Sequence, residues 1–529
     1  MRRSPTTIIL IGLVVIVGAT LRLPLLSLRP MHADEAVHGV KMGQLLETGC
    51  YVYNPNEFHG PTLNALTLPV AWLRGQHSLA DLDEVTLRVV PALFGLGVVL
   101  LPLLWSGGLS RSTLLLAMVF TALSPAMVFY SRYYIQEMLL IFFTTAMMGC
   151  LWRFVQSRHV HWLLLAGLCA GLMHATKETC IIAWGCMVLA WMIVWLIERP
   201  QVVSCGGRPV LGAIALAVLV SVLLMSWFGS HPSGILDSIR TYAVYFHRGT
   251  GHNPHVHPWF YYLDLLTWSE GVEPVMWNED FVLVMGGIGF VFAFFKRHWK
   301  GGAHVLLIRW LALYTFLMWV VYSSIPYKTP WSILGAWQGT LILAGLGMAE
   351  FLRSAQHRWE KIFLWGFLGL FGLASPWAQS VLQGNLYCDA PSNPYVYAHT
   401  HRDIERISNQ VTQAALVHPA GRDLFVEVVW SHDDFWPLPW YLRRFTKVGY
   451  WDQVDVNQPP GDVILAAPEM TEALQQQIYD NPKNPNPELY VPLVPSPTYL
   501  RNGVELTGLV RFGLWQQLSP SQEADPDGP

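Results

Sequence analysis

Two acidic residues stand side by side just after the first apolar segment of the chain. Asp34 and Glu35 follow the apolar run 6–26 in the sequence RPMHADEAVHG. A carboxylate at the mouth of a membrane cavity can deprotonate a hydroxyl group or hold a divalent cation. The same pair can instead start a helix, with Asp34 as the N-cap and Glu35 in the first turn. The sequence leaves both interpretations open, and the helix cap is the commoner of the two.

A further acidic residue that could take part in chemistry is Glu137, in the sequence YSRYYIQEM. It begins a strongly apolar run, where a carboxylate is costly unless it is paired, and such a residue is a functional candidate by default. Arg132 lies five residues earlier and offers a purely structural partner. Function and structural pairing are equally supported at this position.

Three other residues have the chemistry of metal ligands. Glu57 and His59 lie in YNPNEFHGP, and His257 lies in the histidine-rich segment YFHRGTGHNPHVHPWFYYL. Carboxylate and imidazole groups together bind zinc or manganese, although this histidine spacing is only weak evidence. The HPWFYYL end is by default an aromatic belt at the membrane interface. With Arg248, the same segment also has the composition of a site for a sugar or a lipid phosphate.

Two isolated lysines complete the set of candidate residues. Lys177 lies in ATKET and Lys328 in YKTPW, each at the end of an apolar segment. A lysine at a helix end commonly extends its ammonium group toward lipid headgroups. The alternative is a phosphate site, since Lys makes a compact charge contact with phosphate.

These residues are embedded in a chain of long apolar segments. Of its 529 residues, 53% are hydrophobic and 13% are charged, whereas soluble domains carry about 25% charged residues. The net charge of −3, without a basic tract, gives no indication of a nucleic-acid partner. About eleven segments approach the ~20 residues that span a bilayer: 6–26, 85–105, 113–130, 136–152, 161–176, 178–197, 209–228, 281–295, 304–325, 331–352 and 361–382. We therefore predict an α-helical polytopic membrane protein.

The distribution of Lys and Arg among the loops predicts the topology. Alternate short loops hold most of these residues, and such loops lie on the cytoplasmic side. The N-terminus is then cytoplasmic in the cell (inner or plasma) membrane, and loops 27–84 and 229–280 are external. The transmembrane domain is predicted to cover residues 1–382.

An odd number of spans places the remainder of the chain outside as well. We expect residues 383–518 to form a small extracytoplasmic α/β domain and 519–529 to be disordered. Residues 424–430 and 462–467 have the pattern of buried strands, and 403–418 and 470–479 have helical spacing.

Several segments together resemble the GT-C class of membrane glycosyltransferases. The acidic pair is followed by FHGPTLNALT and then, in order, by RVVPALFGLGVVLLPLLW, SPAMVFYSRYYIQEM and ATKET. This order is most similar to the branch that contains protein O-mannosyltransferases and the lipid A aminoarabinose transferase. The resemblance covers about residues 7–350. The tail segments NPYVYAHT and DDFWPLPWYLRRFTKVGYW are similar to the flippase activity-associated subfamily.

The resemblance implies a reaction and roles for these residues. GT-C enzymes transfer a sugar from a polyprenyl phosphate to an acceptor outside the cytoplasm, here a protein, lipid or glycan. Asp34 would be the general base, with Glu35 in support, and Glu137 would lie near the active centre. The predicted phosphate-binding residues are Lys177, Lys328, Arg248 and Arg132.

The resemblance also implies a divalent metal ion (Zn, Mn or Mg), on which the family varies. In the aminoarabinose branch a metal-binding Glu occupies the position of His59, so the chain departs from the pattern there. His remains a competent ligand, Glu57 can substitute for it, and His257 matches a histidine of a later loop. The sugar, hexose or pentose, is left open.

Two other functions compete with this prediction. A lipid-linked sugar flippase, or an accessory protein of one, would lack transfer chemistry and would be expected to place polar residues near the bilayer midplane. A binding or assembly protein that uses the tail domain is the third. The position of the acidic residues at predicted external helix ends favours the enzyme.

Overall fold

The computed structural model describes residues 5–56, 59–200, 206–248, 255–267, 277–295, 304–480, 487–495 and 497–518. Glu57 and the predicted disordered tail 519–529 lie outside these residues. The chain forms two compact units. Unit 1 consists of Met1–Leu28, Thr48–Gln76 and Asp83–Tyr397, and unit 2 consists of Arg29–Glu47, His77–Leu82 and Ala398–Pro529.

The boundary between the units differs from the predicted one. We placed the end of the transmembrane domain at residue 382, whereas unit 1 continues to Tyr397. The reason is that residues beyond 382 bond to helices of unit 1. The Tyr395 hydroxyl donates to Oε1 of Glu279 at 3.0 Å, and the Tyr130 hydroxyl donates to the Tyr395 carbonyl at 2.9 Å.

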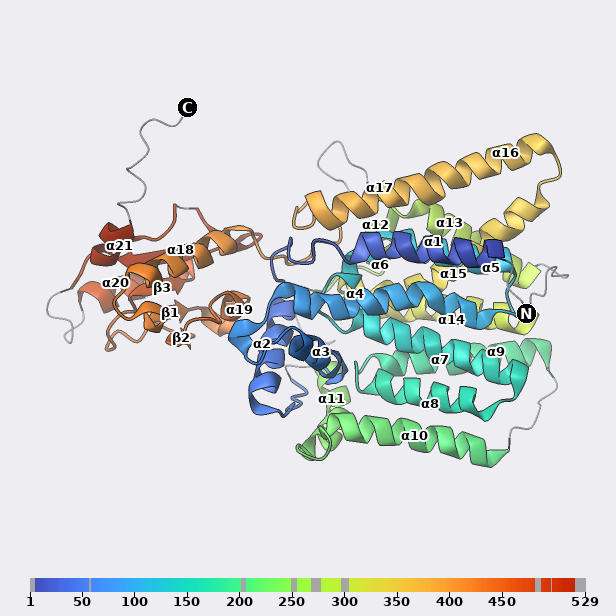
Figure 1. Ribbon diagram of the computed structural model, residues 1–529, viewed down its shortest axis with the longest axis horizontal. Helices are drawn as coiled ribbons and strands as arrows, with labels where there is room; N and C mark the ends of the chain where they lie inside the picture. Colours follow the sequence, from blue (N-terminus) through green and yellow to red (C-terminus); the bar gives the residue numbers. More distant parts are fainter. Residues whose placement is uncertain are drawn as a thin grey trace. The chain divides into compact units, whose positions relative to one another are not determined.

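The helices and short helical segments named below are the regular elements of the described part of unit 1 (Figure 1). Its α-helices are α1 (Pro5–Arg22), α3 (Thr62–Leu73), α4 (Glu84–Leu100), α5 (Arg111–Leu123), α6 (Pro125–Ser131), α7 (Glu137–Ser157), α8 (Val160–His174), α9 (Cys180–Glu198), α10 (Gly207–Met225), α11 (Ser233–Arg248), α12 (Tyr261–Thr267), α13 (Asp280–Phe295), α14 (Val305–Ser324), α15 (Leu334–Ser354), α16 (Arg358–Phe367) and α17 (Ser375–Val381). Four short helical segments continue or precede them: η2 (Leu101–Trp105), η3 (Pro330–Ile333), η4 (Leu368–Ala374) and η5 (Leu382–Leu386).

The structure confirms a polytopic helical protein. Among the described residues, eight helices or continuous helix runs are long and apolar enough to cross a membrane, and α5 with α6, bent by 57° at Ser124, makes a ninth when the bent pair is taken as one span. The other two predicted spans are α8 and α13, which are apolar and have 15 and 16 residues within the described part of the chain. At a rise of about 1.5 Å per residue, helices of this length are shorter than a hydrocarbon core of about 30 Å.

Loops on the same predicted side of the membrane contact one another. On the predicted external side, the Tyr134 hydroxyl bonds to Asn64 Oδ1 at 3.2 Å, so the α6–α7 turn meets α3 of the first loop. On the predicted cytoplasmic side, the backbone N–H of His304 donates to the carbonyl of Gly108 at 2.8 Å. The alternation of loops predicted from charge therefore agrees with the contacts inside unit 1.

Helices α13 and α15 pack closely through glycine. A Cβ added to Gly289 would lie 2.0 Å from the Leu343 carbonyl oxygen, and one added to Gly347 would lie 2.2 Å from the Met285 carbonyl oxygen. Small residues that allow such backbone approach are a common basis of helix packing in membranes.

Unit 2 contains an α/β fold, in agreement with the predicted domain type. Its helical elements are α2 (Ala33–Thr48), η1 (Leu79–Asp81), α18 (Asp403–Val417), η6 (Gly421–Asp423), η7 (Ser431–Asp433), α19 (Leu438–Tyr441), η8 (Pro468–Met470), α20 (Thr471–Tyr479) and α21 (Phe512–Leu518). Its strands are β1 (Val426–Val429), β2 (Val448–Trp451), β3 (Val463–Ala466), β4 (Tyr490–Pro492), β5 (Tyr499–Arg501), β6 (Val504–Glu505) and β7 (Thr507–Arg511). The predicted strands 424–430 and 462–467 are confirmed as β1 and β3.

The main sheet has the order β2-β1-β3-β7-β4. Strands β2 and β3 are parallel to β1, and β7 is antiparallel to its neighbours β3 and β4. Alternate strand residues face two separate cores, since side chains of a strand point to opposite faces. Val426 and Val428 join the core that includes α18 and α21, and Val429 joins the core with α20.

Candidate functional site

A small cavity in unit 1 contains two of the predicted site residues. Glu137 is the first residue of α7, and Lys177 lies in the turn that joins α8 to α9. Oε1 of Glu137 and Nζ of Lys177 form a buried ion pair. An acid is favourable at this position, because the helix dipole is positive at the N-terminus. The ion-pair partner of Glu137 is therefore a lysine from the turn between α8 and α9.

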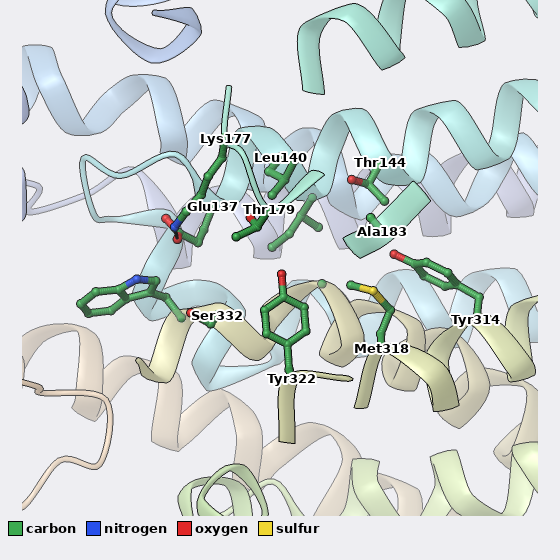
Figure 2. Close-up of a pocket in the computed structure, with 13 residues that line it drawn as sticks. Glu137, Leu140, Thr144, Lys177, Thr179, Ala183, Tyr314, Met318, Tyr322 and Ser332 are labelled. Carbon is green, nitrogen blue, oxygen red and sulfur yellow. Dashed lines mark hydrogen bonds and ion pairs between the residues drawn. The ribbon is translucent and has the colours of Figure 1, made fainter. Parts of the chain in front are cut away.

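The cavity extends from this ion pair along one face of α7. Leu140, Ile141 and Thr144 follow Glu137 at the spacing of one helix face. Figure 2 shows Glu137 and Lys177 together and the Tyr322 hydroxyl, from α14, directed toward the space beside them. The cavity volume is about 40 Å³, which has room for a few water molecules. A sugar phosphate therefore requires the lining side chains to move.

The residue after Lys177 makes a second buried polar cluster. Glu178 Oε2 lies 2.8 Å from Nδ1 of His59, and its Oε1 accepts a hydrogen bond of 2.8 Å from the Tyr53 hydroxyl. Burial by itself would raise the pKa of the Glu178 carboxyl, but the charge and hydrogen bond of His59 outweigh it and lower this pKa to about 2. Glu178 is therefore an ionised group that fixes the orientation of His59.

A third cluster joins His257 and Lys328 to Tyr397. The Tyr397 hydroxyl lies 2.6 Å from Nδ1 of His255 and 3.2 Å from Nε2 of His257. Burial, with the charge of Lys328 beside it, lowers the pKa of His257. Burial also lowers the pKa of Lys328, whose Nζ donates to the carbonyl oxygens of His257 (3.0 Å) and Ile325 (2.5 Å). Two of the three ammonium donors of Lys328 thus hold backbone in place.

The two predicted arginines have different outcomes. The guanidinium of Arg132 donates to the carbonyl oxygens of Gly384, Pro24 and Leu25 at 2.8–3.0 Å. These bonds join residues 24–25 and Gly384 to the turn that carries Arg132. The predicted phosphate contact of Arg132 stays a prediction. The backbone of Arg248 ends α11, but its side chain lies outside the described residues, so its predicted role stays a prediction.

The acidic pair of the first loop belongs to unit 2, where its two members differ. Glu35 is buried, pairs with Nη2 of Arg29 at 3.2 Å and accepts the backbone N–H of His32 at 3.1 Å. His32 directly precedes α2, so Glu35 caps this helix from its third position. Asp34 lies on the exposed side of the first turn, and no side-chain partner of Asp34 is found among the described residues. The capping function therefore belongs to Glu35, and the alternative in which Asp34 is the N-cap is wrong.

The predicted metal ligands do not gather into a metal site within the described residues. No group of three or more His, Cys, Asp or Glu side chains there has the geometry to hold an ion. His59 bonds to Glu178, His257 bonds to Tyr397, and Glu57 lies outside the described part. The donor set that the structure describes does not fit a bound divalent cation.

The sequence reasoning missed several residues of these clusters, among them Glu178, Tyr322 and Tyr397. Glu178 stands beside Lys177 in ATKET, and an acid next to a candidate lysine was a signal that was available. Tyr322 and Tyr397 lie in aromatic-rich segments without a distinguishing pattern. Only the folded chain brings Tyr397 to His255 and His257, which are about 140 residues away along the chain.

Residues 62–230 match the family model of dolichyl-phosphate-mannose-protein mannosyltransferase. This stretch includes Glu137, Lys177 and Glu178. ArnT from Cupriavidus metallidurans, bound to undecaprenyl phosphate, aligns at 15% identity over 95% of this chain and 97% of that chain, with a TM-score of 0.58. The chain has the fold of the GT-C membrane glycosyltransferases.

Other structures with this GT-C fold also align with the chain. The oligosaccharyltransferase AglB from Archaeoglobus fulgidus, in complex with an inhibitory peptide and a dolichol-phosphate, is 11% identical over 90% of this chain and 71% of that chain, with a TM-score of 0.56. The same archaeal enzyme in complex with Zn and sulfate aligns with a TM-score of 0.51, at 12% identity over 90% of this chain and 70% of that chain. Among curated proteins, no relative was found by sequence. The flippase activity-associated subfamily stays a prediction.

Proposed function

We propose that this chain transfers a sugar from a polyprenyl-phosphate donor to an acceptor on the extracytoplasmic face of the membrane. The observation that carries the proposal is the buried Glu137–Lys177 pair, which lines a cavity within the segment that matches the mannosyltransferase model. A buried acid and base at the end of membrane helices are costly features that mark functional sites. The GT-C fold and the lipid phosphates bound to ArnT and AglB support the same donor class.

Lys177 is the proposed site of the donor phosphate. Its ammonium group now bonds to a carboxylate, and a phosphate group of higher charge can compete for the same contact. Displacing Glu137 from Lys177 would also enlarge the cavity, which is too small for a sugar as it stands. Lys177 would then stabilise the negative charge that grows on the phosphate as the sugar leaves.

Asp34 is the proposed general base. It is exposed and has no described side-chain partner, so its carboxylate is available to an acceptor hydroxyl. In the reaction, the acceptor hydroxyl gives its proton to Asp34 while its oxygen attacks the anomeric carbon. The bond from that carbon to the phosphate oxygen breaks, and both electrons leave with the polyprenyl phosphate. Glu35 acts as a positioning residue, because it fixes the first turn of the helix that carries Asp34.

The proposed steps use only side chains of the protein, since the described His, Cys, Asp and Glu groups do not form a metal site. A phosphate leaving group is good, so positioning and charge stabilisation can account for the chemistry. The sugar is a hexose or a pentose, and the acceptor is a protein, a lipid or a glycan. Membrane orientation, with the N-terminus in the cytoplasm of the inner or plasma membrane, is part of the proposal.

Charges in the apolar helices favour an enzyme over a flippase. In the eight candidate spans of the described chain, every Asp, Glu, Lys and Arg lies within five residues of a helix end. A transport path would be expected to place such groups near the bilayer midplane.

The test uses full-length protein in lipid nanodiscs. Undecaprenyl phosphates that carry labelled hexoses or pentoses are supplied with peptide, lipid and glycan acceptors, and transfer of the label is measured. In parallel, proteoliposomes report whether the protein moves the same donors across the bilayer. Transfer without faster translocation is the expected result. Translocation without transfer to any acceptor would show that the protein is a flippase.

A further inference from the structure

Unit 2 contains a crevice that the proposed transfer reaction does not use. It is an open crevice of about 810 Å³, and its lining includes the polar and aromatic side chains of Ser431, His432, Glu469, Tyr499 and Glu505. A pocket of several hundred Å³ with a few convergent polar groups is typical of a ligand site.

The topology of the sheet explains the location of the crevice. Ser431 is separated by one residue from the end of the parallel strand β1. Glu469 lies shortly after the end of the parallel strand β3. The carboxyl ends of parallel strands form the usual binding edge of α/β sheets. Strand β7 is antiparallel to β3, so it begins at this same edge, where the β5–β6 hairpin that precedes it supplies Tyr499 and Glu505.

The walls of the crevice are held together by specific contacts. The hydroxyl of Ser431 donates to Oε1 of Glu469 at 3.2 Å, which joins the ends of β1 and β3. Nη2 of Arg501 lies 2.5 Å from Oδ2 of Asp434 and also donates to its carbonyl at 3.0 Å. The hairpin is thereby fixed to the segment that follows β1. His432 adopts a left-handed conformation at φ 57°, which is costly for a non-glycine residue.

The chemistry of the lining fits hydroxyl groups. Glu469 and Glu505 offer carboxylate acceptors, while Ser431 and the Tyr499 hydroxyl can both donate and accept hydrogen bonds. The guanidinium of Arg501 neutralises the charge of Asp434, and the imidazole of His432 is exposed at the edge. The crevice therefore offers both hydrogen-bond donors and hydrogen-bond acceptors. The Tyr499 ring is partly exposed and offers a face for C–H groups. A basic peptide would bind to the carboxylates of Glu469 and Glu505 alone, and would leave the hydroxyl groups and the Tyr499 ring unused.

We propose that the crevice at the carboxyl edge of the β1–β3 sheet binds a saccharide. Hydroxyl groups of the sugar bond to Glu469, Glu505 and Ser431, and one sugar face packs on the Tyr499 ring. This binding does not depend on the transfer reaction, since its residues are separate from the proposed catalytic residues.

The experiment measures binding to full-length protein in nanodiscs by saturation-transfer NMR and titration. The probes are trimers of mannose, glucose, N-acetylglucosamine and glucosamine, with a lysine-rich hexapeptide as the competing class. We expect at least one trimer to bind. Tyr499→Ala and Glu505→Gln should each weaken this binding by about tenfold, which corresponds to about 1.4 kcal/mol.

Two matched variants test the site itself. Tyr499→Phe keeps the ring and should retain most of the binding, and Glu472→Gln removes an exposed acid of α20 outside the crevice. The thermal midpoint of each variant shows that unit 2 is folded. The proposal is overturned if no trimer binds, if binding survives Tyr499→Ala and Glu505→Gln, or if only the peptide binds with this dependence.

Discussion

Asp34 and Glu35 show how adjacent residues of the same charge take different tasks. Glu35 is fully buried and bonds to Arg29 and to the start of α2, whereas Asp34 faces outward in the same turn. Consecutive helix residues point about 100° apart, so one turn can carry one acid for structure and another for chemistry. The start of α2 at Ala33 determines which of the two side chains is buried, and the sequence did not specify that start.

Lys177→Met tests the proposed phosphate contact. We expect the affinity for undecaprenyl phosphate to fall by about tenfold or more, since a hydrogen bond to a charged group contributes about 1.5–3 kcal/mol. Titration of the lipid into the purified protein measures this. Lys361→Met, at an exposed position of α16, is the control.

Removing Lys177 also leaves Glu137 buried without its ion-pair partner. The double variant Glu137→Gln/Lys177→Met corrects for this effect, because it removes both charges together. Unchanged affinity in the folded double variant would show that Lys177 does not bind the phosphate.

Glu178→Gln tests the electrostatic role of its carboxylate. The pKa of Glu178 is lowered from 4.5 to about 2, so its stabilising contribution is present above pH 4.5 and is lost as the pH falls through 2. A difference of about 2.5 in pKa corresponds to on the order of 3 kcal/mol. The thermal midpoint of the variant should therefore lie below wild type at pH 6, and the gap should shrink toward pH 3. A gap that is constant with pH would contradict this account.

At the scale of elements, the hydrophobic pattern predicted the helices and the central strands well. The runs that became α7, α9 and α15 are long and continuous, and β1 and β3 are short buried runs with clear turn residues. The bend between α5 and α6 was not predicted, although Ser124 and Pro125 mark it, because a serine cap followed by proline can begin a new helix. Within the site, the Glu137–Lys177 pair could not be predicted, since it depends on how α7 packs beside the α8–α9 turn.

Gly289→Ala tests the close packing of α13 on α15. The added Cβ would lie 2.0 Å from the Leu343 carbonyl, and relieving the clash should cost about 1–3 kcal/mol of stability. Gly287→Ala is the matched control in the same helix, because its Cβ meets nothing within 4 Å. Thermal unfolding of both variants in detergent should show a lower midpoint for Gly289→Ala alone. Equal midpoints would show that the helices pack less tightly.

At the scale of the whole molecule, charge alternation in the loops predicted two sets of loops, and contacts inside unit 1 agree with them. The sequence did not indicate that residues of the first loop would join the tail in one compact unit. Met31 illustrates this arrangement, since its backbone N–H donates to the Tyr441 hydroxyl at 2.9 Å. A contact between residues so far apart along the chain produces no local pattern in the sequence from which it could be predicted.

Cysteine labelling tests the proposed orientation in the membrane. We expect Leu416→Cys, in an exposed position of α18, to react with an impermeant maleimide in spheroplasts. Ser157→Cys, at the predicted cytoplasmic end of α7, should react only after lysis. The background replaces Cys50 and Cys205 by Ser. Protection of Leu416→Cys in intact spheroplasts would show that the membrane orientation is opposite to the proposed one.

The central claim is that Asp34 takes the proton of the acceptor during sugar transfer. The most direct measurement is the single-turnover transfer rate of Asp34→Asn, with donor saturating and Glu472→Gln as the control. Because the Asp34 side chain is exposed, the variant should fold normally and keep its affinity for undecaprenyl phosphate. The account predicts a rate reduced by about 10²–10⁴-fold, the usual contribution of general base catalysis. A rate within a few-fold of wild type would show that Asp34 is not the base.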